Sequence, residues 1–181
     1  LLRRVNRPTI SGSLGVSGTA PHPARPHVSR APQFQAFTPE NTLAVFTSNN
    51  ESSIASHCSK ISELCSQPKV ITNLAQNELI CQALVGFLSE DFQDSTKILI
   101  LCAIATLFVL SGNLKEEYAD GLSIVFLEFL DSQNAELIFQ TIQVIATMVE
   151  NSGYARDSIL TFGIQDMIAN IALAESDPNL T

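Results

Sequence analysis

The sequence IATL at residues 104–107 returns as IATM at residues 145–148, about 41 residues further along the chain. Weaker echoes have nearly the same spacing: FLS at 87–89 matches FLD at 129–131, and Gly121 matches Gly163. Apolar residues around these echoes recur three and four positions apart, which is typical of amphipathic helices. Helical units that repeat about every 40 to 47 residues bury their apolar faces by stacking on their neighbours. We therefore expect an all-α chain of stacked repeats.

Between the echoes, one order of helices is predicted twice. A short first helix is followed by a second helix and then by a long third helix, which is the armadillo order rather than the two-helix HEAT order. The third helices are expected over residues 52–66, 96–110 and 135–150, the first helices over 70–74, 114–119 and 154–161, and the second helices over 77–88, 122–130 and 164–174. We therefore predict an armadillo-type, right-handed superhelical solenoid.

Several local details of these helices are predicted as well. Thr38 and Pro39 are expected to start the folded domain, as an N-cap followed by proline at the first helical position. Asp94-Ser95 is expected to cap the next long helix, while Leu79 and Cys65 fall on apolar faces that should point inward. Gly121 and Gly163 are expected to end helices in a left-handed conformation.

Charge and composition divide the chain into two parts. Residues 1–39, rich in Pro, Gly and Ser, predict a disordered basic tail, and residues 40–181 predict an armadillo-repeat domain of about three repeats, the last incomplete, so we expect the natural chain to continue. Five arginines give the tail +5, whereas five cations against 18 acids give the domain −13. Such a domain attracts basic peptides and repels nucleic acid and anionic membranes. The expected partner is a basic peptide or cargo protein, with no nucleic acid and no membrane.

Catalysis and metal binding find no support in the sequence. The four cysteines form no C-x-x-C pair and have no histidine at zinc-finger spacing, so they are expected to be small core residues. His57 and Cys58 are neighbours on one helix and point in different directions, which does not make a catalytic pair. The apolar run at 98–110 is shorter than the roughly 18 to 20 residues that span a bilayer. We expect no enzyme and no cofactor.

The acid-free N-terminus leaves a third class of protein open. Its arginines and serines resemble a mitochondrial transit peptide in composition, which would make the chain a matrix protein with a cleaved presequence. Five prolines and three glycines before residue 33 would interrupt the amphipathic helix that such a presequence forms.

Three stretches resemble the importin alpha family, the adaptors that carry nuclear localisation signals. NSGYARD at 151–157, followed by GIQD at 163–166, is similar to the family's G-D-G-S-x-x-R-D and G-A-I-D segment. VFTSNN at 45–50 resembles the run that enters the family's first repeat, and LLRRVNR at 1–7 resembles the L-L-K-R-R-N end of its importin-beta-binding segment. The matches occur in the family's order and cover most of the chain.

This resemblance implies a binding groove with altered chemistry. In the family, tryptophans of W-x-x-x-N pairs on the third helices sandwich lysine stems, and the asparagines hydrogen-bond the peptide backbone. The matching positions hold Cys102 and Gln143 in place of tryptophan, and Thr106 and Thr147 in place of asparagine. The acidic residue that selects lysine is replaced by Asn151, with Glu150 beside it. Ser111 and Gly112 stand at the helix end. The chain has no tryptophan, and a threonine hydroxyl cannot reproduce an amide's paired donor and acceptor. Conventional signal binding is therefore expected to be altered.

Each of these positions also has a structural interpretation. Thr106 and Thr147 are expected to bond back to their own helices or to line a packed surface, and Cys102 is expected to be a core residue rather than a contact. Arg3, Arg4 and Arg7 are implied to bind an importin-beta-like carrier or to act as an autoinhibitory segment; a generic basic tail is the alternative.

The sequence therefore predicts a nuclear import adaptor-like protein of the cytoplasm and nucleus, which binds basic localisation-signal peptides in an acidic groove and bridges to importin beta. The alternative is a general armadillo-repeat scaffold for protein–protein interaction without a role in transport.

Overall fold

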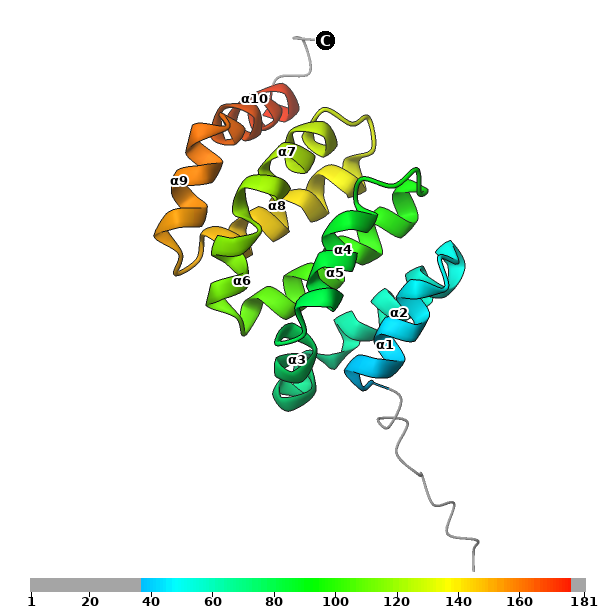
Figure 1. Ribbon diagram of the computed structural model, residues 1–181. Coiled ribbons are helices and arrows are strands. Elements are labelled where there is room, and N and C mark those ends of the chain that lie inside the picture. The colour runs from blue at the N-terminus through cyan, green and yellow to red at the C-terminus, as the bar shows by residue number, and fades with distance from the viewer. Residues whose placement is uncertain (1–36, 177–181) are drawn as a thin grey trace, which may run out of the picture. The chain divides into compact units, whose positions relative to one another are not determined.

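The computed structural model describes residues 37–176, and this part of the chain is helical without a strand. Its elements in chain order are α1 (Pro39–Thr47), α2 (Glu51–Ser62), the 3-10 helix η2 (Glu63–Ser66), α3 (Pro68–Ala75), α4 (Glu78–Phe87), α5 (Asp94–Val109), α6 (Gly112–Glu117), α7 (Ala119–Leu130), α8 (Ala135–Val149), α9 (Gly153–Thr161) and α10 (Ile164–Ser176) (Figure 1). The all-α prediction is confirmed. Arg3, Arg4, Arg7 and the rest of the predicted tail up to residue 36 lie outside the described residues, as do residues 177–181.

Five helices begin at a residue whose side chain caps the helix. The Thr38 side chain accepts a hydrogen bond from the Asn41 N–H at 3.3 Å, with Pro39 at the first helical position, as expected. Asparagines cap three further helices in the same way: Asn50 for α2, Asn77 for α4 and Asn134 for α8. The helix starts are therefore encoded locally.

The three long helices α2, α5 and α8 lie side by side, with α5 in contact with both of the others (Figure 1). Near their beginnings, the Glu51 carboxylate accepts from the Gln93 N–H at 2.8 Å, and Asp94 accepts from the Asn134 side-chain amide at 2.9 Å. Because each bond joins the start of one long helix to the residue just before the next, the helices run in the same direction. Successive long helices are therefore parallel.

The shorter helices pack against the long ones in a recurring order. The order α3, α4, α5 is followed by α6, α7, α8, and within each set the second helix contacts the third. Contacts between sets include α1 with α4, α7 with α10 and α6 with α9. The predicted sequence of short, second and long helix therefore recurs in space as well as along the chain.

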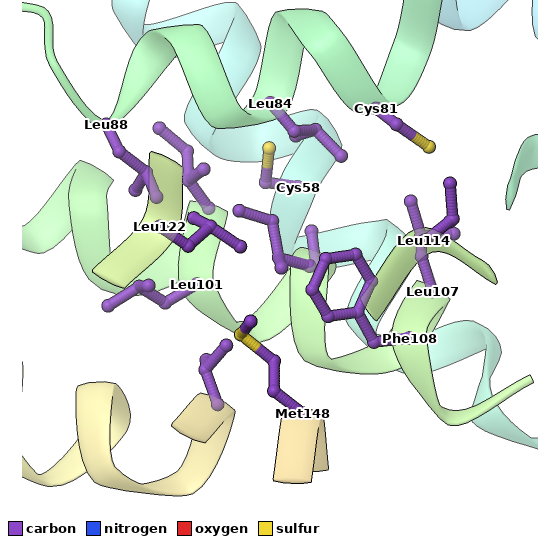
Figure 2. Close-up of a cluster of buried hydrophobic side chains, with 14 of the residues drawn as sticks. Cys58, Cys81, Leu84, Leu88, Leu101, Leu107, Phe108, Leu114, Leu122 and Met148 are labelled. Carbon is purple, nitrogen blue, oxygen red and sulfur yellow. The ribbon is translucent and has the colours of Figure 1, made fainter. Parts of the chain in front are cut away.

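The core runs through these helices without a break. Figure 2 shows side chains from α2 and from α4 to α8 pointing toward one another: Cys58, Cys81, Leu84, Leu88, Leu101, Leu107, Phe108, Leu114, Leu122 and Met148. Leu101 and Leu107 on α5 are almost fully buried, as expected for a helix enclosed by neighbours. Burial thus accounts for much of the apolar run at 98–110, whereas Val109 and Leu110 at its end are exposed.

Two glycine predictions have different outcomes. Gly163 has a φ of +71° between α9 and α10, so the predicted left-handed helix end is confirmed. The prediction for Gly121 is wrong, because this residue lies inside α7 and has no positive φ. Helix α7 begins at Ala119, directly after Tyr118, which ends α6, so the predicted turn at residues 120–121 does not occur.

Three side-chain predictions are also wrong. Leu79 is 61% exposed because it lies in the first turn of α4, where no neighbouring helix covers it. Cys65 is exposed because the chain has passed from α2 into η2, which changes the helical phase. Gln93, rather than Asp94-Ser95, occupies the cap position of α5, and it makes no side-chain cap bond.

Candidate peptide-binding surface

The predicted groove positions on α5 and α8 lie on one outward face of each helix. On α5 the residues that are not buried recur at three- and four-residue spacing through Ile98, Cys102, Ala105 and Val109. The equivalent row on α8, about 41 residues later, is Phe139, Gln143, Ala146 and Glu150, all exposed. We call these two rows the outward faces of α5 and α8.

Thr106 and Thr147 make the same bond in both helices. Thr106 Oγ1 donates to the Cys102 carbonyl at 2.9 Å, and Thr147 Oγ1 donates to the Gln143 carbonyl at 2.9 Å. The back-bonding interpretation of these two residues is therefore confirmed. Because each hydroxyl already donates its proton to a helix carbonyl, it can accept a hydrogen bond from a peptide N–H but cannot donate one.

Cys102 joins α5 to α8 rather than standing free. Its Sγ lies 3.4 Å from Gln140 Oε1, and the Gln140 amide nitrogen donates to Glu136 Oε1 at 3.2 Å. Burial raises the pKa of the Cys102 thiol, with a further contribution from Glu136, so the sulfur stays a neutral donor at pH 7. The sequence did not single out Gln140, because its role depends on the helix opposite.

The outward face of α8 carries two exposed side chains, Phe139 and Gln143, of which only Gln143 was predicted from the sequence. Gln143 was predicted, and its side-chain amide makes no hydrogen bond within residues 37–176, so its donor and its acceptor are both available. Phe139, one helical turn earlier, is 53% exposed and was missed. The signal was present, because Phe139-x-x-x-Gln143 has the spacing of W-x-x-x-N, displaced by one turn.

The remaining predicted residues lie at helix ends. Ser111 occupies the cap position of α6 without a side-chain cap bond, and Gly112 is the exposed first residue of that helix. Glu150 ends α8 with its side chain exposed, and exposed Asn151 follows with a φ of +62°. Within residues 37–176, no hydrogen bond joins these four residues to one another.

Lys115, which was not predicted from the sequence, stabilises the C-terminal end of α8. It is only 5% exposed, and its Nζ donates to the Glu150 carbonyl at 2.9 Å. A cation is favourable at this place, because the end of a helix carries partial negative charge and unpaired carbonyls.

Two hollows adjoin the long helices. An apolar pocket of about 260 Å³ lies between η2 and α3 on one side and the end of α5 on the other, where Thr106, Val109 and Leu110 line it. A larger hollow of about 880 Å³ is lined by α1 and α2 and includes Phe37, His57, Lys60 and Glu63.

His57 in the larger hollow has a structural role. Its Nε2 lies 3.0 Å from Thr42 Oγ1, and its ring contacts the rings of Phe37 and Phe46 at centroid distances of 4.9 and 5.8 Å. Burial lowers the pKa of His57, and the nearby Lys60 lowers it further. The neutral imidazole therefore joins α1 to α2.

Comparison of the whole chain with protein-family models, with curated proteins and with solved structures gave no match. Between residues 37 and 176, no cluster of three or more His, Cys, Asp and Glu side chains could hold a metal ion. The same residues include no helix long and apolar enough to cross a bilayer.

Proposed function

We propose that the chain is part of an armadillo-type solenoid and that the outward faces of α5 and α8 bind an extended, basic segment of a partner protein. The observation that carries this proposal is the exposed Phe139–Gln143 pair on α8, with Glu136 and Glu150 near its two ends. An aromatic face attracts a lysine and its methylene stem, a free amide pairs with a peptide group, and a carboxylate favours the ammonium.

The parallel long helices support an extended partner. Neighbouring helices lie about 10 Å apart, and an extended chain advances about 3.3 Å per residue, so a crossing segment passes about three residues per helix. Equivalent positions on α5 and α8 would then meet every third residue of the partner.

Charge supports a basic partner. Within residues 37–176 there are 17 acids and five cations, which gives −12. Such an excess steers cationic segments toward the surface, and salt screens this attraction.

The more specific form of the proposal is nuclear import. It rests on the sequence resemblance to importin alpha, with Arg3, Arg4 and Arg7 as the residues that bind an importin-beta-like carrier. In this form Phe139 and Gln143 take over the work of the missing tryptophan and asparagine, and the threonines only accept hydrogen bonds.

One observation favours the second candidate, a scaffold without a transport role. Thr106 and Cys102 are already bonded within the domain, so α5 offers a partner little polar chemistry. A scaffold of this kind would bind segments without a requirement for lysine.

The test is a titration of the full chain with a labelled lysine-rich peptide, followed by fluorescence anisotropy at low and high salt. Salt-sensitive binding is expected, and Phe139→Ala should weaken it by roughly threefold to fivefold, the size of one exposed cation–π contact. Leu79→Ala is the matched control, because Leu79 is similarly exposed and lies on α4, outside the outward faces of α5 and α8. Equal binding of lysine-rich and serine-substituted peptides would favour the scaffold.

The transport form needs its own measurement. Purified importin beta should bind the full chain, and replacement of Arg3, Arg4 and Arg7 by alanine should abolish that binding while leaving peptide binding intact. Peptide binding without any carrier binding would contradict the import role.

A further inference from the structure

The ends of the long helices differ at equivalent positions. Helix α5 ends in Val109 and Leu110, which are 65% and 45% exposed. About 41 residues later, the corresponding residues at the end of α8 are Glu150 and Asn151, and about 43 residues earlier Ser66 and Gln67 stand at the end of η2, which continues α2. The middle helix therefore has an exposed apolar pair where its two neighbours have polar residues.

This apolar pair adjoins the pocket of about 260 Å³. The walls of the pocket are Pro68 and Ile71 of α3 on one side and Thr106, Val109 and Leu110 of α5 on the other. A cavity of this size suits one side chain rather than a whole small molecule, since small-molecule sites measure about 300 Å³ or more. The pocket shares Thr106 with the proposed binding surface, so one partner segment can reach both.

The charges around the pocket restrict what enters it. Lys69, exposed in the first turn of α3 beside Pro68, repels a lysine from the pocket itself. Glu63 is exposed on η2, where it lines the larger hollow rather than this pocket, and Glu150 is exposed at the end of α8. In the order η2, α5, α8, these elements offer an exposed acid, an apolar pocket and a second exposed acid.

We propose that the pocket at the end of α5 holds a bulky apolar side chain of the partner segment, with basic residues about three positions before and after it. The three-residue interval follows from the spacing of the helices and the rise of an extended chain. This inference rests on the proposed function and adds a selectivity to it: the apolar residue fixes the register of the segment, and the flanking lysines face Glu63 and Glu150.

The proposal is tested with three labelled peptides and the full chain. The first peptide has Phe at its centre, Lys three residues to either side and Gly or Ser elsewhere; the second replaces Phe by Ser; the third replaces both Lys by Ser. The Phe peptide is expected to bind about tenfold tighter than its Ser counterpart, as burial of a large apolar side chain predicts.

Two variants locate the effect. Val109→Gln with Leu110→Asn gives α5 a polar end without adding charge, and it should remove the preference for Phe, so that the Phe and Ser peptides bind with equal affinity. Leu79→Gln with Ile124→Asn removes two equally apolar, exposed residues elsewhere and should leave the preference intact. Ala105→Leu fills the pocket from α5 and should also remove the preference without lowering the melting temperature.

The outcomes separate the two proposals. Salt-sensitive binding of the Phe and Ser peptides with equal affinity overturns the pocket and leaves the basic-segment function standing. Binding of the third peptide as tightly as the first overturns the role of the flanking lysines. If the Phe preference survives Val109→Gln with Leu110→Asn, the pocket is not the site. Failure of all three peptides to bind overturns both proposals.

Discussion

Helices α5 and α8 occupy equivalent places in the fold, yet they agree on one face and differ on the other. Their buried faces match over residues 104–107 and 145–148, with Ile104 equivalent to Ile145 and Leu107 to Met148. Their outward faces diverge: Cys102 is equivalent to Gln143 in the sequence alignment, and Val109 is equivalent to Glu150. Packing constrains the buried faces to similar shapes, whereas solvent leaves the outward faces free to differ. Differences in binding chemistry are therefore expected on the outward faces.

The largest test of this comparison concerns the shared core. Leu107→Ala and Met148→Ala should each lower the free energy of unfolding by about 2 to 5 kcal/mol, because both side chains are almost fully buried. Urea unfolding of the full chain gives both values. A loss below about 1 kcal/mol for either variant would show that the two helices are not equivalent in packing.

The residues at the starts of α5 and α8 should contribute differently to the free energy of unfolding. Asn134 caps α8 through the N–H groups of Glu136 and Leu137 and also donates to Asp94, so Asn134→Ala should cost about 1 to 2 kcal/mol. Gln93 at the same place on α5 makes no side-chain cap bond, so Gln93→Ala should cost less than about 0.5 kcal/mol. Equal losses in urea unfolding would contradict this assignment.

The two matched glycines give a smaller contrast. Gly163→Ala should destabilise by about 1 kcal/mol because its φ is positive, although no atom lies within 4 Å of the new methyl group. Gly121→Ala, inside α7, should instead stabilise by up to about 1 kcal/mol. Thermal unfolding measured on both variants distinguishes the signs, and a stabilising Gly163→Ala would refute the left-handed conformation.

The smallest expected effect is a pH dependence of the free energy of unfolding, caused by His57 in α2. His57 is equivalent in position to Ile100 in α5 and to Thr141 in α8. The pKa of His57 is lower in the folded state than in the unfolded one, so folding disfavours the proton. Stability is therefore complete above the unfolded pKa of about 6.5 and is lost as pH falls below it. His57→Gln should flatten the stability profile between pH 7 and 5 in urea unfolding. An unchanged slope would assign that dependence to other groups.

Features encoded by neighbouring residues were predicted well. The threonine–proline start at residue 38 and the recurrence of the long helices follow from local capping and helical periodicity. The junction at Tyr118 was not predicted, because glycine is tolerated inside a helix and Gly121 gave a misleading turn signal. Leu79 was misplaced for a related reason, since its exposure depends on the absence of a covering neighbour rather than on its own spacing.

The binding role of the candidate site stays a prediction. Cys102 and Gln143 lie on the outward faces of α5 and α8, and Phe139 on the same face of α8 was not predicted because the family alignment directed attention one turn later. Lys115 and Gln140 could not be identified from spacing, because each acts on a helix distant in sequence. Their partners, the Glu150 carbonyl and the Cys102 thiol, are known only once the helices are packed.

The bonds from Glu51 to Gln93 and from Asp94 to Asn134 have a consequence for any bound segment. Each fixes the axial position of one long helix relative to the next, so sliding between them would break a charged hydrogen bond. The spacing between outward-face positions is then set by the protein and not by its ligand. A bound partner segment would therefore have to match this fixed spacing. Inserting one residue between its apolar and basic positions should cost more affinity than replacing either flanking lysine by arginine.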